Sequence, residues 1–329
     1  MNKRILITGA AGFVGRRLVK FMLDKGYYVI AVDNIAHLTG GIDPKNGWPL
    51  YNPKDYNNFE FYKEDCREWF KKNYNKKFDY VFHLAAMVGG REIIENNPLT
   101  VAEDLSIDSH FWQWCSKSKP IKIICFSSSA CYPIELQKFN NYRLLKENDI
   151  SFQNNIGMPD MTYGWAKLTC EYLANIAFEK YNLKSVCYRP FSGYGEDQDL
   201  NYPFPSICKR ILKNKDKDLI EVWGSGNQMR DFIYIDDCIE GMYKTMDKIN
   251  DGSAINLSTG KFTSFINFTK QACDLLGLKP KITGTSSKPE GVFARGGDTT
   301  KQKNLGFEYK IELQEGIKKT FNYFEKINF

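Results

Sequence analysis

Two short segments of the chain hold side chains that could together move a proton and a hydride. Tyr163 and Lys167 lie one turn apart on the same face of a predicted helix. A cation there is expected to lower the pKa of the phenol, and a phenolate can take the proton of an alcohol while its carbon gives hydride to a nicotinamide. This spacing is common by chance. The interpretation as a catalytic pair is strengthened by Ser127-Ser128-Ser129, which follows a predicted buried strand. Ser129, or otherwise Ser128, is expected to hold the substrate oxygen beside the phenol.

A glycine-rich turn near the N-terminus points to the source of that nicotinamide. The run Thr8-Gly9-Ala10-Ala11-Gly12-Phe13-Val14-Gly15 follows the first predicted strand and opens a helix predicted from Arg16 to Lys25. Glycines there let backbone amides approach a pyrophosphate; the alternative is a turn that only packs a helix on a sheet. The second predicted strand ends at Asp33, where an acid can bind the adenosine ribose and repel a 2′-phosphate. The predicted cofactor is therefore NAD, although Arg16 mildly favours NADP.

The residues expected to bind the dinucleotide lie at the ends of successive strands. They are Gly9, Gly12, Phe13, Val14, Gly15, Asp33, Asn34, Asp65, Cys66, Leu84, Ala85 and Ala86, together with Tyr163 and Lys167. Asp65 is placed to meet the adenine edge, unless it is a solvated loop residue. His83 is expected to support the nucleotide loop, and no metal site is predicted.

These residues require a sheet whose strands all end at one edge. Short apolar runs at residues 5–7, 28–32, 80–82 and 121–126 alternate with helical patterns. The alternation predicts an α/β fold with a Rossmann-type, doubly wound parallel sheet and ligands at the carboxyl ends of its strands. After Arg189-Pro190 the rhythm loosens, which predicts a smaller, interleaved C-terminal α/β substrate-binding domain.

The predicted boundary between the two domains is therefore not a single cut. We assign residues 1–190 to an NAD-binding domain, with residues 230–256 returning to it. Residues 191–229 and 257–329 form the second domain. A length of 329 residues agrees with two domains, at roughly 150 residues each.

Composition narrows the partners and the compartment. The net charge of +6 is spread over 45 basic and 39 acidic residues, which gives no reason to invoke nucleic acid and fits an anionic small ligand. The 9 cysteines include no CxxC pair and are expected to be reduced core residues of a cytoplasmic protein. No run approaches the roughly 18 apolar residues of a membrane span, so no membrane partner is predicted.

Several motifs occur in the order found in extended short-chain dehydrogenases/reductases that act on nucleotide sugars. Besides the segments above, they are His83-Leu84-Ala85-Ala86, Arg189-Pro190 and Arg230-Asp231-Phe232-Ile233-Tyr234-Ile235-Asp236-Asp237. Within that superfamily, three further runs resemble GDP-mannose 3,5-epimerase and, more distantly, GDP-fucose synthase. They are Met87-Val88-Gly89-Gly90, Ser129-Ala130-Cys131-Tyr132-Pro133 and Pro289-Glu290-Gly291-Val292-Phe293-Ala294-Arg295.

The resemblance covers nearly the whole chain and carries several implications. It implies a GDP-sugar substrate, a tightly held NAD, a transient C4 ketone and a homodimer formed through the helix that bears Tyr163. The implied substrate-binding residues are Val88, Gly89, Ser128, Ser129, Ser192, Arg230 and Arg295. The two arginines are assigned to the diphosphate and ribose, because a guanidinium suits phosphate in charge and in bidentate geometry.

The chain also departs from these relatives. Inversion at C3 or C5 beside a C4 ketone needs an acid and a base beyond the phenol. Cys131 matches the relatives' cysteine and could exchange the carbon-bound proton, or it could be a small packed side chain. The relatives' partner lysine or histidine has no counterpart from Glu196 to Tyr202. Ser192 replaces a substrate-binding asparagine, and Leu105 falls near a helix asparagine.

The sequence thus predicts an NAD-dependent, epimerase-type enzyme that oxidises C4 of a nucleotide sugar, with a GDP-sugar favoured. The catalytic candidates are Ser129, Tyr163, Lys167 and Cys131. One alternative is a GDP-sugar 4-dehydrogenase that stops at the ketone. Another is a non-catalytic NAD-sensing binding protein, against which the intact Ser/Tyr/Lys set argues, because a sensor has no need of an activated phenol.

Overall fold

The computed structural model of the chain describes residues 3–285 and 291–328. Pro289 and Glu290, which begin one of the motifs above, lie outside this part of the chain. Within the described ranges, no helix combines the length and the apolar character needed to cross a bilayer.

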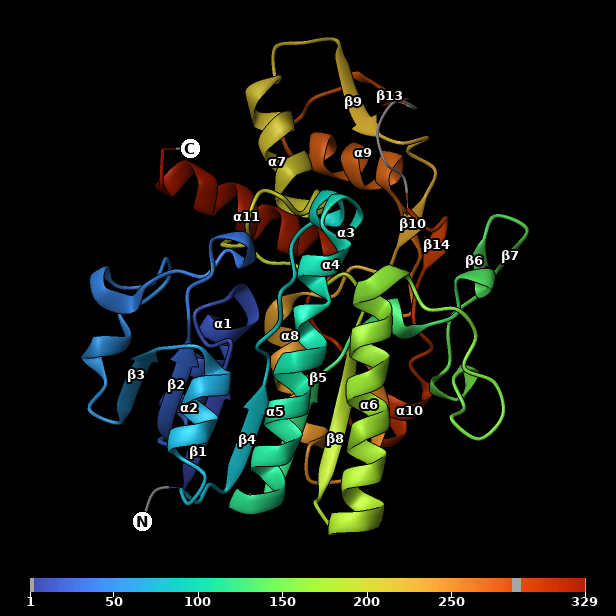
Figure 1. The fold of residues 1–329 in the computed structure, drawn as a ribbon. Coiled ribbons are helices and arrows are strands. Elements are labelled where there is room, and N and C mark those ends of the chain that lie inside the picture. The colour runs from blue at the N-terminus through green and yellow to red at the C-terminus, as the bar shows by residue number, and fades with distance from the viewer. Residues whose placement is uncertain (1–2, 286–290, 329) are drawn as a thin grey trace.

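Seven parallel strands form the central sheet, in the order β11-β8-β5-β4-β1-β2-β3 (Figure 1). The strands are β1 (Arg4–Thr8), β2 (Tyr28–Asp33), β3 (Phe59–Lys63), β4 (Tyr80–His83), β5 (Lys122–Phe126), β8 (Ser185–Pro190) and β11 (Asp251–Leu257). Every neighbouring pair is parallel, so the predicted doubly wound sheet is confirmed. Chain order reverses between β1 and β4, and a reversal of this kind leaves a crevice for ligands at the carboxyl ends of the strands.

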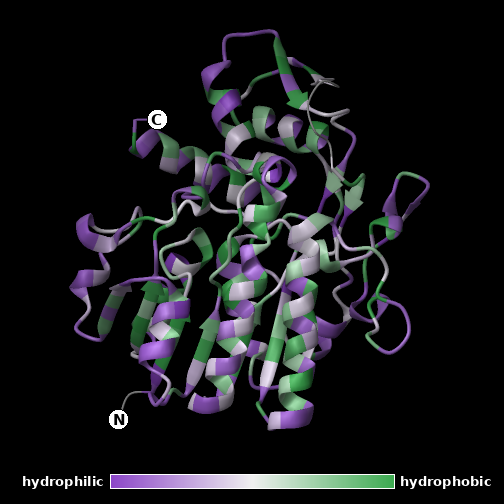
Figure 2. Cartoon of the chain, in the orientation of Figure 1, coloured by the Kyte–Doolittle hydropathy of each residue, from purple (hydrophilic) through white to green (hydrophobic). Residues whose placement is uncertain are grey.

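Helices cover both faces of the sheet, because successive side chains of a strand point to opposite sides. On one face, α1 (Phe13–Asp24) and α8 (Ile235–Thr245) pack in one core with Ile5 and Ile7. On the other, α2 (Cys66–Lys72), α5 (Glu103–Ser118) and α6 (Met161–Tyr181) pack with Leu6. Figure 2 shows the strands of this sheet as mainly hydrophobic and the covering helices as two-sided.

A second group of elements stands over the carboxyl ends of the strands, at the top of Figure 1. Its helices are α7 (Pro203–Lys213), α9 (Phe265–Leu275) and α11 (Leu313–Lys326), and its strands β9 (Leu219–Trp223) and β13 (Lys281–Thr285) pair in parallel. Phe204, Phe268 and Ile317 belong to a separate buried cluster in this group. The second group thus has its own core, separate from the two that cover the faces of the sheet.

The remaining described elements are short. They are the helices α3 (Arg91–Asn96), α4 (Pro98–Val101) and α10 (Thr300–Asn304), the pair β6 (Gln137–Lys138) and β7 (Asn141–Tyr142), and the mixed sheet of β12 (Thr263–Ser264), β10 (Met229–Arg230) and β14 (Ala294–Arg295).

One local expectation changes. The helix predicted from Arg16 begins at Phe13, because Gly12 takes the N-cap position. The run from Phe232 to Ile235 forms a single bridge, from Tyr234 to Tyr194, before α8 begins. The later segment that joins the central sheet as a strand is β11, which pairs with β8 and which the sequence patterns did not single out.

Candidate active site

A cavity of about 860 Å³ opens at the carboxyl ends of the strands, between the sheet and the second group of elements. All fourteen residues predicted to bind the dinucleotide line it, and so do the seven predicted to bind the substrate. Of the catalytic candidates, Ser129, Tyr163 and Lys167 line the cavity, whereas Cys131 does not. The fold therefore brings together nearly the whole predicted set, from strand ends that are far apart in the sequence.

The glycine-rich turn needs two of its glycines for packing and leaves the third towards the cavity. Gly9 has a φ of 68°, and a Cβ there would lie 2.6 Å from the Ala85 nitrogen. A Cβ on Gly15 would overlap the carbonyl oxygen of Gly9. Gly12 meets the same oxygen at 3.4 Å and caps α1, where free amide groups can receive an anion.

Asp33 ends β2 and is held by the glycine turn. One carboxylate oxygen accepts from the Ala11 amide at 2.9 Å and the other from the Ile35 amide at 2.7 Å. Burial raises its pKa, against the lowering effect of these amides. Arg16 is buried, donates to the Ala11 carbonyl at 2.7 Å and pairs with Asp197 at 3.0 Å. Its guanidinium is therefore already paired within the protein. This pairing argues against Arg16 as a contact for the 2′-phosphate of NADP.

Asp65 has a structural contact besides its place on the cavity wall. It caps α2 by accepting from the Arg67 amide at 2.8 Å, and its carboxylate pairs with the Arg67 guanidinium at 2.6 Å. These interactions with Arg67 lower its pKa, against the effect of burial. Both residues line the cavity, so a ligand at this end would meet a neutralised pair instead of a lone acid.

His83 supports the loop that follows β4, as predicted. Its Nδ1 lies 2.8 Å from the Thr8 hydroxyl, and its Nε2 lies 3.0 Å from Asp108. The ring stacks on Phe111, with the two centroids 3.8 Å apart. Burial lowers the pKa of the imidazole, against the effect of Asp108. A histidine locked between two partners in this way orients the glycine turn and β4.

The proposed hydride-transfer side chains lie together on α6. The Lys167 ammonium is 5.8 Å from the centre of the Tyr163 ring. Although burial opposes it, the charge of Asp104 holds the pKa of Lys167 above its usual range. The net pKa of Tyr163 is raised, because burial and Asp104 outweigh Lys167. The predicted lowering effect of Lys167 on the phenol pKa is present, but the larger effect of burial leaves the net pKa raised.

The two candidate serines differ in what their hydroxyls already do. Ser128 accepts from the Ala130 amide at 3.1 Å, and its side chain lowers the pKa of Tyr163, against the larger effect of burial. Ser129 lines the cavity, and no described residue is seen to hydrogen-bond with its hydroxyl. Ser129 is therefore the better placed of the two to bind a ligand oxygen, while the Ser128 hydroxyl already caps the turn that follows it.

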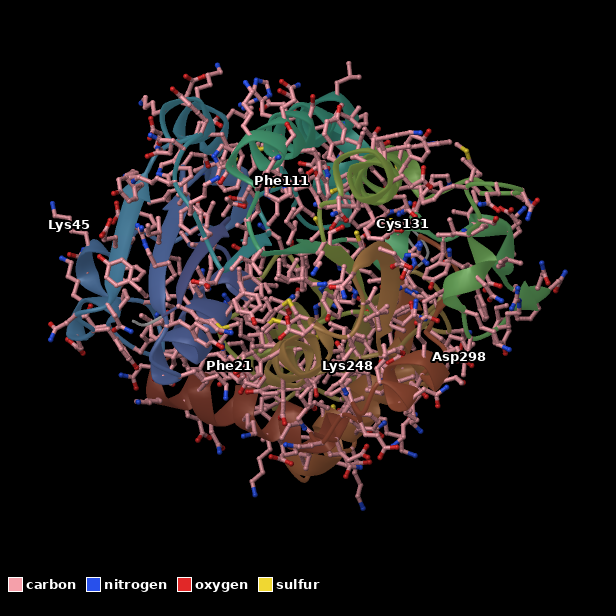
Figure 3. The ribbon with its side chains drawn as sticks, turned by 90° about the horizontal axis from the view of Figure 1, so that it is seen from below. Phe21, Lys45, Phe111, Cys131, Lys248 and Asp298 are labelled. Carbon is pink, nitrogen blue, oxygen red and sulfur yellow. The ribbon has the colours of Figure 1, made fainter. Side chains whose placement is uncertain are left out.

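Cys131 lies in the interior beside α6, where Figure 3 labels it. Its sulfur is 3.2 Å from the hydroxyl of Ser127, which also donates to Glu171. Glu171 in turn pairs with Arg189 at 2.6 Å. Burial raises the pKa of the thiol, and the Glu171 charge adds to this effect. The structure therefore favours the packing interpretation of Cys131 over the acid/base one.

The segment that carries the relatives' partner residue is fixed to α1. Asp197 pairs with both Arg16 and Arg17, and Glu196 pairs with Arg17 at 2.8 Å. Tyr202, at the end of the segment, lines the cavity. The two acids at the start of this segment hold the loop in place, and Asp199 and Tyr202 are its titratable residues on the cavity wall besides Asp197.

The sequence analysis missed three polar residues in or beside the site: Arg91, Asp160 and Asp104. Arg91 and the predicted Arg295 both pair with Asp160, at 2.9 and 2.7 Å, and these three residues line the cavity. Arg230, predicted for the substrate, donates to the Val292 carbonyl at 3.0 Å. The third missed residue, Asp104, lies behind Lys167. The signal for Asp160 is an acid directly before the Tyr163 helix, and Asp104 adjoins the predicted helix asparagine position at Leu105.

The sheet, the glycine turn and the Ser/Tyr/Lys set define the class: an NAD-dependent short-chain dehydrogenase/reductase of the extended type. The model of the NAD dependent epimerase/dehydratase family matches residues 5–258, and the chain belongs to that family.

Three comparisons describe what the chain is similar to. It is 28% identical to UDP-glucuronate 4-epimerase of Thermodesulfobacterium geofontis over 324 residues, covering 97% of this chain and 95% of the relative. It is 26% identical to GDP-mannose 3,5-epimerase 1 of Oryza sativa subsp. indica over 331 residues, covering 98% and 81%. The structure of UDP-glucose 4-epimerase with UDP-glucose from Thermotoga maritima matches with a TM-score of 0.82 and 26% identity, covering 99% of this chain and 100% of that one. The chain is therefore an enzyme of the nucleotide-sugar epimerase and dehydratase type, and its relatives include both UDP- and GDP-sugar enzymes.

Proposed function

We propose that the protein oxidises C4 of a nucleotide-bound sugar to a ketone and returns the hydride to invert that carbon. The observation that carries the proposal is the convergence of Ser129, Tyr163 and Lys167 on the cavity that the glycine turn also lines. When bound, oxidised NAD supplies the hydride acceptor. Ser129 holds the C4 oxygen, Tyr163 removes its proton, and Lys167 remains protonated to stabilise the phenolate.

Confinement of the chemistry to C4 is supported by the placement of Cys131. Proton exchange at C3 or C5 would need a group that reaches the sugar, and this thiol is fully buried and does not line the cavity. A 4-dehydrogenase that stops at the ketone uses the same three residues, so product analysis must distinguish the two.

Arg230 and Arg295 are proposed to bind the substrate diphosphate. Both line the cavity on the side of the second group of elements. The resemblance of the motif ending at Arg295 supports a GDP-sugar, whereas the names of two of the relatives above support a UDP-sugar. We keep the GDP-sugar as the first substrate to test and the UDP-sugars as the second.

We further propose that residues 1–190 and 230–256 form the NAD-binding domain and that residues 191–229 and 257–329 form the substrate domain. Two separate cores support this division, one around β1 and α1 and the other around α7 and α9, although Phe307 packs in the first and Phe232 and Tyr234 pack in the second. A homodimer formed through α6 is supported by Trp165 and Tyr172, which are seven residues apart on that helix and both exposed.

The test is direct. The purified protein is loaded with NAD and incubated separately with GDP-mannose, UDP-glucose and UDP-glucuronate, while reduced cofactor is followed by absorbance and products by NMR. An epimerase inverts C4 without accumulating NADH; a dehydrogenase accumulates NADH in proportion to ketone. Absence of both reactions with every sugar would contradict the proposed function for these substrates, and inversion at C3 or C5 would restore a role for Cys131.

A further inference from the structure

Behind the catalytic lysine lies a buried carboxylate that the mechanism above does not use. Asp104, on α5, is 1% exposed. One of its oxygens accepts from the backbone amide of Met87. The other is buried without a hydrogen-bond partner and lies 3.8 Å from the Lys167 ammonium. A buried carboxylate oxygen is costly unless a cation faces it, so this ion pair is a built feature of the site.

The position of Asp104 joins two walls of the cavity. Its amide contact fixes the start of the segment from Met87 to Gly90, which lines the cavity after β4. Its free oxygen faces α6, one turn below Tyr163. Asp104 itself is not on the cavity wall, so it acts on a ligand only through other residues.

We propose that Asp104 is a positioning residue of the hydride-transfer site. It holds the Lys167 ammonium beside the Tyr163 ring and offsets part of the positive charge that the phenol experiences. The offset keeps Tyr163 a phenol in the protein without cofactor. The positive charge of oxidised nicotinamide can then favour the phenolate. Reduced nicotinamide is neutral and has no such effect. The last step rests on the proposed function; the positioning of Lys167 does not.

The charged and titratable groups around this pair set the expected pH behaviour. Asp104 faces Lys167 on α6 and, along α5, Asp108 and Glu103; burial raises its pKa to about 6. Tyr163 faces Lys167 and Asp104, and also Ser128 and Cys131 in the turn after β5. Two more titratable groups lie near this pair. The charge of Lys167 contributes to the lowered pKa of His83, and Tyr163 contributes to the raised pKa of Tyr202.

Asp104→Asn tests the charge, because it keeps the shape and one acceptor for the Met87 amide. The protein without cofactor is labelled with ¹³C at the tyrosine ring, and the Tyr163 resonance is assigned by its loss in Tyr163→Phe. The Tyr163 titration is expected to move to lower pH by about one unit, since an uncompensated cation now faces it. Asp104→Ala should show the same shift and, in addition, a lower affinity for NAD, because the Met87 amide loses its acceptor.

Asp108→Asn is the matched control. It removes the same charge one turn along α5, where the partner is His83, and it should leave the Tyr163 titration in place. If Asp104→Asn fails to fold, wild-type protein carrying ¹⁵N-methionine gives the same information: the Met87 amide and the Tyr163 ring should both respond to one titration with a midpoint near pH 6.

The proposal would be overturned if the Tyr163 titration is unchanged in Asp104→Asn. It would also be overturned if, in the wild type, the Met87 amide resonance shifts near pH 6 while the Tyr163 ring resonance does not. These measurements need no turnover, so a failed sugar assay would count against the proposed function alone. With an active sugar in hand, the pH profile of NAD reduction in Asp104→Asn should shift in the same direction as the phenol.

Discussion

The two ends of the cavity are built in different ways. At the cofactor end, the glycine turn and Asp33 come directly after strands, and backbone amides such as that of Ala11 fix them. At the substrate end, Arg91, Asp160 and Arg295 come from three distant segments and are paired with each other. The cofactor end is therefore determined locally by strand and turn, whereas the substrate end depends on tertiary ion pairs.

The difference has a chemical consequence. A dinucleotide meets groups that the fold holds open for it, such as the N-cap of α1 at Gly12. A substrate diphosphate bound as proposed would meet Arg295, which already pairs with Asp160, so its binding would compete with that carboxylate. Binding at the substrate end should then be weaker for each contact and more easily altered by mutation than binding at the cofactor end.

The largest expected effect lies where the two ends meet. Tyr163→Phe removes the proton-accepting oxygen and should lower turnover by roughly 10²- to 10⁴-fold with little change in NAD affinity. Tyr181→Phe, which changes an exposed tyrosine at the end of the same helix, is the control and should keep full turnover. Stopped-flow absorbance of NADH formation measures both. Normal turnover in Tyr163→Phe would mean that this residue is not the proton acceptor between cofactor and substrate.

The glycine turn tests the local construction of the cofactor end. Gly15→Ala forces a methyl group onto the Gly9 carbonyl and should destabilise the protein without cofactor by about 1–3 kcal/mol, measured by thermal unfolding. Gly12→Ala has room within the protein and should keep the melting temperature while weakening NAD binding. Equal stability of the two variants would contradict the assignment of one glycine to packing and the other to the ligand.

The substrate end should respond more moderately. Arg295→Ala removes one charged contact to the diphosphate and should raise KM by roughly 10-fold with kcat little changed, since a hydrogen bond to a charged group contributes about 1.5–3 kcal/mol. Arg143→Ala, which removes an arginine paired with Asp149 outside the cavity, serves as the control. Initial rates over a range of substrate concentrations separate KM from kcat. A change in kcat alone would place Arg295 in the chemical step.

Cofactor choice gives a smaller effect. Asp33 should make NAD bind at least about tenfold more tightly than NADP, because its carboxylate accepts from ribose hydroxyls and repels a 2′-phosphate. Asp33→Asn should narrow that ratio. Titrations of both dinucleotides by protein fluorescence provide the measurement. Equal binding by the wild type would return Arg16 to consideration despite its pairing with Asp197.

The smallest expected effect is at Cys131. Cys131→Ala should change turnover by no more than about twofold, because it alters a buried side chain that does not reach the cavity. Wild-type enzyme turning over in D₂O should place no deuterium at C3 or C5. Label at either carbon that disappears in Cys131→Ala would show that the thiol does reach the sugar.

The sequence carried enough information for the cofactor end. The glycine turn, Asp33 and the Tyr163/Lys167 pair are signals that local spacing encodes, and Gly9, Gly12 to Gly15, Asp33, Tyr163 and Lys167 all line the cavity. Strand ends at one edge of a parallel sheet are brought together by topology, so predicting the strands also predicted the site.

The substrate end and the support behind Lys167 could not be found in the same way. Asp104 reads as one of several acids in a helix, and its neighbour Leu105, which drew attention, is 42% exposed. What distinguishes Asp104 is a contact to Lys167 across two packed helices, and spacing within one helix carries no information about it. Likewise, the net pKa of Tyr163 depends on burial, which the YxxxK pattern does not report.

The late arrival of β11 also bears on how the chain is made. Synthesis proceeds from the N-terminus, so α7 and β9 are produced before the strand that completes the central sheet. Until residues 251–257 emerge, β8 has one side without a strand, and its backbone N–H and C=O groups there lack the partners that β11 provides. The nascent chain therefore passes through a stage in which the edge of β8 is open to wrong pairing. That edge is closed only by β11, which is made after α7 and β9.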